Sequence, residues 1–231
     1  LVEMFVEKLT GLEAPVDTDF IVSQSQELSL PYTDKSSKPF YSVRATLGAE
    51  EPDWLSRHRI NMSAAEGVWT GTGIDDGLGT AFKYVDSPGF DDLQDESHQD
   101  RLERISDLRK RFVNLVQRGI APYLFMYVTG EPTEAWIRSR PELLGPRSYY
   151  GPTDRKSYRP LCWSNQDTRQ LIRELIKEIV RTYPNLAGFH LRSWGDETRV
   201  CTCDECEGRQ GELLWAIYFD IIDAARQIRP E

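Results

Sequence analysis

Two adjacent carboxylates, Asp196 and Glu197, have the residue types and the position that acid–base chemistry requires. They follow the apolar run LAGFHLRSW, which is typical of a strand, and Gly195 just before them permits a bend. Two carboxylates in different environments can divide a reaction, one as general acid and the other as base or charge stabiliser. The alternative is a solvated acidic turn or a helix N-cap.

A second cluster with chemical potential follows at once, in the cysteine motif CTCDEC. Its three thiols, together with one distant cysteine near a predicted helix start, could form a closed four-thiolate zinc site. The four are Cys162, Cys201, Cys203 and Cys206. Disulfides among them, or free thiols, are the alternatives. The sequence shows no open set of His and carboxylate ligands, so we expect zinc to be structural and no cofactor to serve catalysis.

Six further side chains lie at or near predicted strand ends, where a substrate would bind: Arg44, Trp69, Tyr127, His190, Arg192 and Trp194. Arg44 is either a clamp for sugar hydroxyls or a carboxylate, or an ion-pair partner of Asp196 or Glu197. His190, Arg192 and Trp194 share one strand face, because strand side chains alternate with a period of two. A histidine within a strand is equally compatible with a core position.

Composition excludes several classes of partner. The net charge of -9 argues against nucleic acid, because phosphate contacts need a basic face. No apolar run reaches the length of a membrane span, so no membrane partner is expected. The six Trp and ten Tyr are suited to stacking on sugar rings, although core packing uses the same residues. The N-terminus lacks the pattern of an intact secretory signal, and periplasmic, extracellular and cytoplasmic locations all stay open.

Predicted strands and helices alternate along the chain. Apolar and β-branched runs predict strands at 40–48, within 60–69, at 120–130 and at 186–197. Helical spacing or capping residues predict helices at 52–59, 97–118, 167–183 and 209–228. Long loops follow the strands, notably at 131–165, whereas short ones follow the helices.

The two longest helices have amphipathic patterns that predict their buried positions. In helix 97–118 these are Leu102, Ile105, Leu108, Phe112, Leu115 and Val116. In helix 209–228 they are Leu213, Leu214, Ile217, Phe219, Ile221 and Ile222.

This order predicts an α/β fold with a parallel sheet of the (β/α) TIM-barrel type. A doubly wound sheet is less consistent, because RATLGAEEPDW after the first strand is no glycine-rich phosphate turn. Residues 1–38 resemble the end of a small α/β domain and a linker, and 39–231 supply only about four β/α units. The chain is therefore expected to be the N-terminal half of a barrel, or to associate with another copy if the half barrel is the whole chain.

With these residues in place, the chain resembles barrel glycoside hydrolases related to family 20 β-N-acetylhexosaminidases and to α-glucuronidases. The resemblance rests on FYSVRATLG with Arg44, on the strand HLRSWGDE, and on CTCDEC. It implies that Glu197 protonates the glycosidic oxygen, that Asp196 orients and stabilises a substrate N-acetyl group, and that Arg44 holds sugar hydroxyls. Where the family commonly has His-x-Gly-Gly-Asp-Glu, this chain has Trp194 before the glycine and an additional cation, Arg192, which leaves room for an acidic sugar.

The functional prediction is a glycoside hydrolase that cleaves a terminal sugar from an oligo- or polysaccharide, hexosaminidase-like or glucuronidase-like. The alternative is a carbohydrate-binding or zinc-braced barrel protein without activity. Replacing Glu197 separates the two, because only the first would lose turnover.

Overall fold

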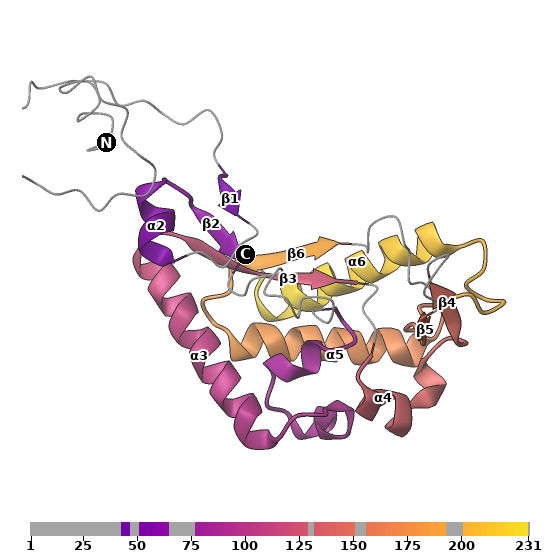
Figure 1. The fold of residues 1–231 in the computed structure, drawn as a ribbon. Coiled ribbons are helices and arrows are strands. Elements are labelled where there is room, and N and C mark those ends of the chain that lie inside the picture. Colours follow the sequence, from indigo (N-terminus) through magenta and orange to yellow (C-terminus); the bar gives the residue numbers. More distant parts are fainter. Residues whose placement is uncertain are drawn as a thin grey trace, which may run out of the picture. The chain divides into compact units, whose positions relative to one another are not determined.

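Four parallel strands form one sheet in the order in which they occur along the chain. They are β1 (Ala45–Thr46), β2 (Met62–Ala64), β3 (Ala121–Tyr127) and β6 (Gly188–Arg192). The register places Ala45 beside Met62, Met62 beside Ala121, and Tyr127 beside Arg192. Because all the pairs are parallel, the carboxyl ends of the strands lie at one edge of the sheet (Figure 1).

The computed structural model describes residues 43–46, 51–64, 77–128, 132–150, 156–192 and 201–230. All of them belong to the unit formed by residues 41–231. The expected domain end at 1–38 lies outside the described residues and stays a prediction.

A helix follows each strand. These helices are α2 (Pro52–Arg57), α3 (His98–Gln117), α5 (Gln166–Thr182) and α6 (Gln210–Ile228). α3 and α5 lie on the same side of the sheet in Figure 1, and α6 packs along α5. A doubly wound fold would place helices on both faces, whereas sequential parallel strands with helices on one face are the arrangement of a (β/α) barrel. The predicted α/β class, with about four units of a barrel, is confirmed.

The helix starts follow from capping residues. The Ser97 hydroxyl accepts a hydrogen bond from the Asp100 amide at the start of α3. The Asn165 side chain accepts from the amides of Asp167 and Thr168 at the start of α5, as the motif SNQD predicts. These caps occupy amide groups that the first helical turn leaves without partners.

The two faces of the sheet differ in what covers them. Leu124 and Met126 point toward the helices and join the main core. Tyr123, Phe125 and Tyr127 alternate with them and form a separate buried cluster. We call this second side the open face because His190 and Arg192 on it are exposed, although the three rings themselves are buried. In a closed barrel it would be the interior.

The segment after β3 is more ordered than the predicted loop at 131–165. It contains α4 (Glu134–Ser139), a 3-10 turn η3 (Pro141–Leu143) and an antiparallel hairpin of β4 (Ser148–Tyr150) and β5 (Lys156–Tyr158). The prediction that 131–165 is a loop is therefore wrong for the residues of these elements. The hairpin could have been predicted, because aromatic residues flank the turn-forming motif GPTD in the sequence.

The segment before α3 also contains local structure that was predicted as loop. Two 3-10 turns, η1 (Ala81–Tyr84) and η2 (Pro88–Leu93), insert the buried side chains of Phe82 and Leu93 into the main core. Their turn-forming residues have no helical period, which is why the pattern of the sequence indicated only a loop.

Not all predicted buried positions of the helices are buried. Ile105, Leu108, Phe112 and Leu115 of α3 and Leu213, Ile217 and Ile221 of α6 are in the core. Leu102, Val116, Phe219 and Ile222 are more than a third exposed, which corrects the prediction for these four. In the described part of the chain, no helix combines the length and the apolarity needed to cross a membrane.

Candidate functional site

Three of the predicted site residues, Tyr127, His190 and Arg192, lie on β3 and β6 at or near the carboxyl edge of the sheet. Tyr127 and Arg192 end these strands side by side, and the Val128 amide donates a hydrogen bond of 3.0 Å to the Arg192 carbonyl. Asp196 and Glu197 follow within five residues of Arg192 but lie outside the described residues, as do Trp69 and Trp194. Their predicted roles stay predictions.

Aromatic rings line the open face up to this edge. The His190 ring centroid lies 4.9 Å from that of Phe125 and 5.8 Å from that of Tyr123. Phe125 and Tyr127 meet edge to face at 5.1 Å, and the Arg192 guanidinium lies 6.0 Å from the Tyr127 ring centroid. At the carboxyl edge this face presents the exposed side chains of His190 and Arg192 beside the buried Tyr127 ring, and an imidazole and a guanidinium can stack on or hydrogen-bond to a sugar ring.

His190 sits on this face as a neutral base. Partial burial, together with the nearby Arg192 guanidinium, holds the pKa of His190 below its usual range, so the imidazole is uncharged at pH 7. Its side chain is accessible to solvent, in contrast to the alternative of a core histidine. Arg192 is also exposed and forms no ion pair with any described residue. Both side chains expose nitrogen atoms that can form hydrogen bonds with a ligand.

The structure does not bring Arg44 to this edge. Arg44 precedes β1, its amide donates to Asn61 Oδ1 at 2.7 Å, and its Nε donates to the Arg59 carbonyl at 2.5 Å. The register places Arg44 about seven residues before the level of Tyr127 and Arg192, or about 23 Å along the strands. The structure therefore places Arg44 near the amino ends of the strands, apart from Arg192.

The four cysteines, by contrast, come together. The hairpin base brings Cys162 into place, because the Cys162 amide donates to the Leu143 carbonyl at 3.1 Å. Cys201, Cys203 and Cys206 lie in the turn that precedes α6. The cluster thus lies near the N-termini of both α5 and α6, where the helix dipoles favour negative charge.

The spacing of these sulfurs fits a tetrahedral metal ion. All four Sγ atoms lie within 4.8 Å of one another, and Cys162 Sγ lies 3.8 Å from Cys203 and 4.0 Å from Cys206. A Zn–S bond of about 2.3 Å gives a sulfur–sulfur edge of about 3.8 Å in a tetrahedron. These distances are about twice a disulfide bond of about 2.05 Å, and all four thiols are free. The donor set matches a closed site with four cysteine ligands.

The pKa values of three of the cysteine thiols are shifted in opposite directions. A hydrogen bond from Cys201 lowers the pKa of Cys162 to about 4. The same hydrogen bond, followed by burial, raises the pKa of Cys201, and burial also raises the pKa of Cys206. A divalent cation that bound all four sulfurs would displace the protons that they still carry.

Gly145 is a part of this cluster that the sequence did not reveal. Its amide donates to the Pro160 carbonyl at 2.8 Å, at the base of the hairpin. A Cβ atom there would lie 2.5 Å from Cys201 Sγ and 3.1 Å from Cys201 Cβ. Only glycine leaves space for the Cys201 side chain. A single glycine between two apolar residues and a proline gives no sequence signal for such a role.

Gly145→Ala is therefore expected to displace Cys201. The free energy of unfolding should fall by about 1–3 kcal/mol, as for other overpacked sites, and the number of metal ions bound per chain should decrease. Urea unfolding and elemental analysis measure the two effects. Gly89→Ala is the matched control, because a Cβ there meets only Ser87 Oγ, at 3.9 Å. Equal stability and metal content for both variants would contradict the packing argument.

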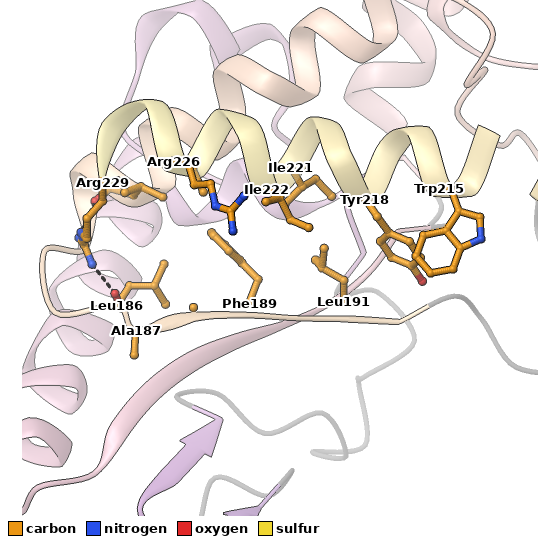
Figure 2. Close-up of a pocket in the computed structure, with 13 residues that line it drawn as sticks. Leu186, Ala187, Phe189, Leu191, Trp215, Tyr218, Ile221, Ile222, Arg226 and Arg229 are labelled. Atoms are coloured by element: carbon orange, nitrogen blue, oxygen red, sulfur yellow. Dashed lines mark hydrogen bonds between the residues drawn. The ribbon is translucent and has the colours of Figure 1, made fainter. Parts of the chain in front are cut away.

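A separate groove lies elsewhere in the described part of the chain. It has a volume of about 490 Å³ and runs between β6 and α6, on the helix-covered side of the sheet. Figure 2 shows Phe189 and Leu191 pointing from β6 toward α6, with Trp215 and Tyr218 at one end and Arg226 near Phe189. Its lining is mostly apolar and holds no carboxylate. We therefore do not regard it as the catalytic site.

Comparisons with known proteins do not assign a family. No family model and no curated protein matches the chain. Among solved structures, the chain is similar to a beta-galactosidase from Rahnella sp. R3, with a TM-score of 0.38 and 18% identity over 76% of this chain and 22% of that one. It is also similar to Gan42B, a GH42 beta-galactosidase from G. stearothermophilus, with a TM-score of 0.38 and 14% identity over 80% of this chain and 26% of that one.

The chain thus spans about a quarter of the length of these two structures. Neither of them is a family 20 hexosaminidase or an α-glucuronidase. At such TM-scores, the likeness assigns the chain to no family, and its activity has to be argued from its own residues.

Proposed function

We propose that the chain is part of a glycoside hydrolase that cleaves a terminal sugar from an oligo- or polysaccharide. The observation that carries the proposal is the open face, whose aromatic rings end at Tyr127, His190 and Arg192 on the carboxyl edge of a parallel sheet. Active sites of (β/α) barrels lie at this edge. In the sequence, the Asp196–Glu197 pair begins four residues after Arg192.

In this proposal Glu197 is the general acid, which protonates the glycosidic oxygen as the bond to the anomeric carbon breaks. Asp196 remains ionised and stabilises the positive charge that develops on the sugar. Tyr127 and His190 contact the sugar ring, with Trp69 and Trp194 as further candidates from the sequence. A hexosaminidase-like or glucuronidase-like specificity follows from the sequence resemblance alone, and Arg192 is compatible with an acidic sugar.

We propose in addition that Cys162, Cys201, Cys203 and Cys206 hold a structural zinc ion. The support is the tetrahedral spacing of their sulfurs. With four protein ligands the ion would have no position for a substrate, so its role would be to fasten the β4–β5 hairpin to the turn before α6. A zinc-braced, non-catalytic carbohydrate-binding protein is the second candidate, and this cluster is the observation that favours it.

Glu197→Gln tests the enzyme. We expect kcat on the glycoside that the wild-type chain hydrolyses best to fall about 10²- to 10⁴-fold, the usual contribution of a general acid. Sugar binding, measured by calorimetry, should stay within a few-fold, because the amide has nearly the shape of the carboxylic acid. Initial rates on a panel of nitrophenyl glycosides provide the measurement.

Glu207→Gln is the control, because Glu207 is an exposed glutamate just after the cysteine cluster. It should leave kcat unchanged. An unchanged rate for Glu197→Gln would refute its role as acid. Sugar binding without turnover by the wild-type chain would favour the non-catalytic candidate.

A further inference from the structure

A serine hydroxyl lies among the sulfurs of the cysteine cluster. Ser164 Oγ is 3.3 Å from Cys162 Sγ, 3.3 Å from Cys206 Sγ and 3.9 Å from Cys203 Sγ. Ser164 follows Cys162 by two residues and directly precedes Asn165, the N-cap of α5. Its position is therefore fixed by the same turn that fixes Cys162.

A buried site with four thiolates carries excess negative charge, which a hydroxyl that donates a hydrogen bond can stabilise. Four thiolates around a divalent cation leave a net charge of about −2 in a buried place, and buried charge is stable only where hydrogen-bond donors face it. One donor is the Cys203 amide, whose nitrogen lies 3.5 Å from Cys201 Sγ. The Ser164 hydroxyl is placed to donate to the sulfur of Cys162, whereas toward Cys206 its oxygen accepts a hydrogen bond from the thiol in the metal-free chain.

The hydroxyl is better placed to donate than to bind the metal. Four sulfurs already complete the tetrahedron, and the Oγ–Sγ distances of 3.3 Å are those of a hydrogen bond between oxygen and sulfur. Side chains that hydrogen-bond metal ligands in this way orient the ligands and tune their charge.

We propose that Ser164 is a positioning residue of the metal centre. Its hydroxyl donates a hydrogen bond to the Cys162 thiolate, which holds this side chain in the tetrahedral arrangement and offsets part of its charge. This inference rests on the metal centre proposed above and is independent of the glycosidase activity.

The test uses the full chain and cobalt as a spectroscopic substitute for zinc. Metal-free wild type, Ser164→Ala and Ser164→Thr are titrated with Co²⁺ while the sulfur-to-cobalt charge-transfer absorption is recorded, and zinc affinity is measured by competition with a chelator. We expect Ser164→Ala to weaken zinc binding about 10- to 100-fold and to shift the charge-transfer band. Ser164→Thr, which keeps the hydroxyl, should restore both.

Ser139→Ala is the matched control, because the Ser139 hydroxyl donates to the carbonyls of Asp92 and Ala135, away from the sulfurs. It should leave affinity and spectrum unchanged. Wild-type affinity and spectrum in Ser164→Ala would overturn the role of Ser164 alone. If Ser164→Thr did not restore them, Ser164 would act through packing and not through its hydroxyl. A wild-type chain that bound neither metal would overturn the metal centre as well.

Discussion

Asp220→Ala should lower the free energy of unfolding by about 3 kcal/mol or more, the usual cost of removing one partner from a buried ion pair. Asp220 projects from α6 with only 8% of its side chain exposed. Its Oδ2 lies 2.6 Å from Arg169 Nε, and its Oδ1 lies 2.5 Å from Arg173 Nη2. Both arginines belong to α5, so one carboxylate joins the two helices. Without it, two partly buried guanidinium groups face each other with no counter-charge between them.

Urea unfolding followed by circular dichroism gives the value, and Asp223→Ala is the matched control. Asp223 lies one turn further along the same helix and is exposed, so its loss should change the free energy by less than about 0.5 kcal/mol. A double-mutant cycle of Asp220→Ala and Arg173→Ala should show that the two losses of unfolding free energy are strongly non-additive. If Asp220→Ala cost no more than Asp223→Ala, the ion pairs would not stabilise the packing of α5 on α6.

The parts of the fold that could be predicted are those with a regular pattern. The apolar spacing of α3, the cap at Asn165 and the continuous apolarity of β3 identified these elements within a few residues. Phe219 and Ile222 were misassigned because the period of an amphipathic helix says which residues are apolar, not which surface covers each of them. Local turns such as η1 and η2 have no period to detect.

The candidate site likewise has parts that the sequence could predict and parts that it could not. The motif CTCDEC indicated thiols close in space, because three of them are close in sequence. Cys162 was expected as the fourth thiol because it precedes the predicted helix at 167–183, and the hydrogen bonds at the base of the hairpin, at 143–145 and 160–162, hold it there. Arg44 was expected at the catalytic edge because it lies in the first strand, but the structure begins this strand at Ala45 and ties the arginine to the Arg59 carbonyl. Position within a strand depends on register, which only pairing defines.

Removal of the metal should destabilise the chain by about 4 kcal/mol under conditions where free zinc exceeds its dissociation constant a thousandfold. The reason is that the proposed zinc would bind only the folded arrangement of sulfurs, in which Cys162 is 41 residues from Cys203 in sequence and 3.8 Å from it in space. For a chain of this length, such a change corresponds to a fall in Tm of about 10 °C. Calorimetry before and after chelation measures it, with elemental analysis of zinc on the same samples.

The control for this experiment is a variant that lacks two of the ligands, Cys201→Ser together with Cys206→Ser. Its Tm should already be low and should not respond to chelator or to added zinc, because two thiolates cannot hold the ion against chelation. In the wild-type chain, added zinc should restore the original Tm. A chelator effect of the same size in both proteins would locate the metal away from these cysteines, and no effect in either would contradict a structural zinc. The expected pattern, a loss confined to the wild type and reversed by zinc, would make the cysteine cluster the brace that joins the hairpin to α6.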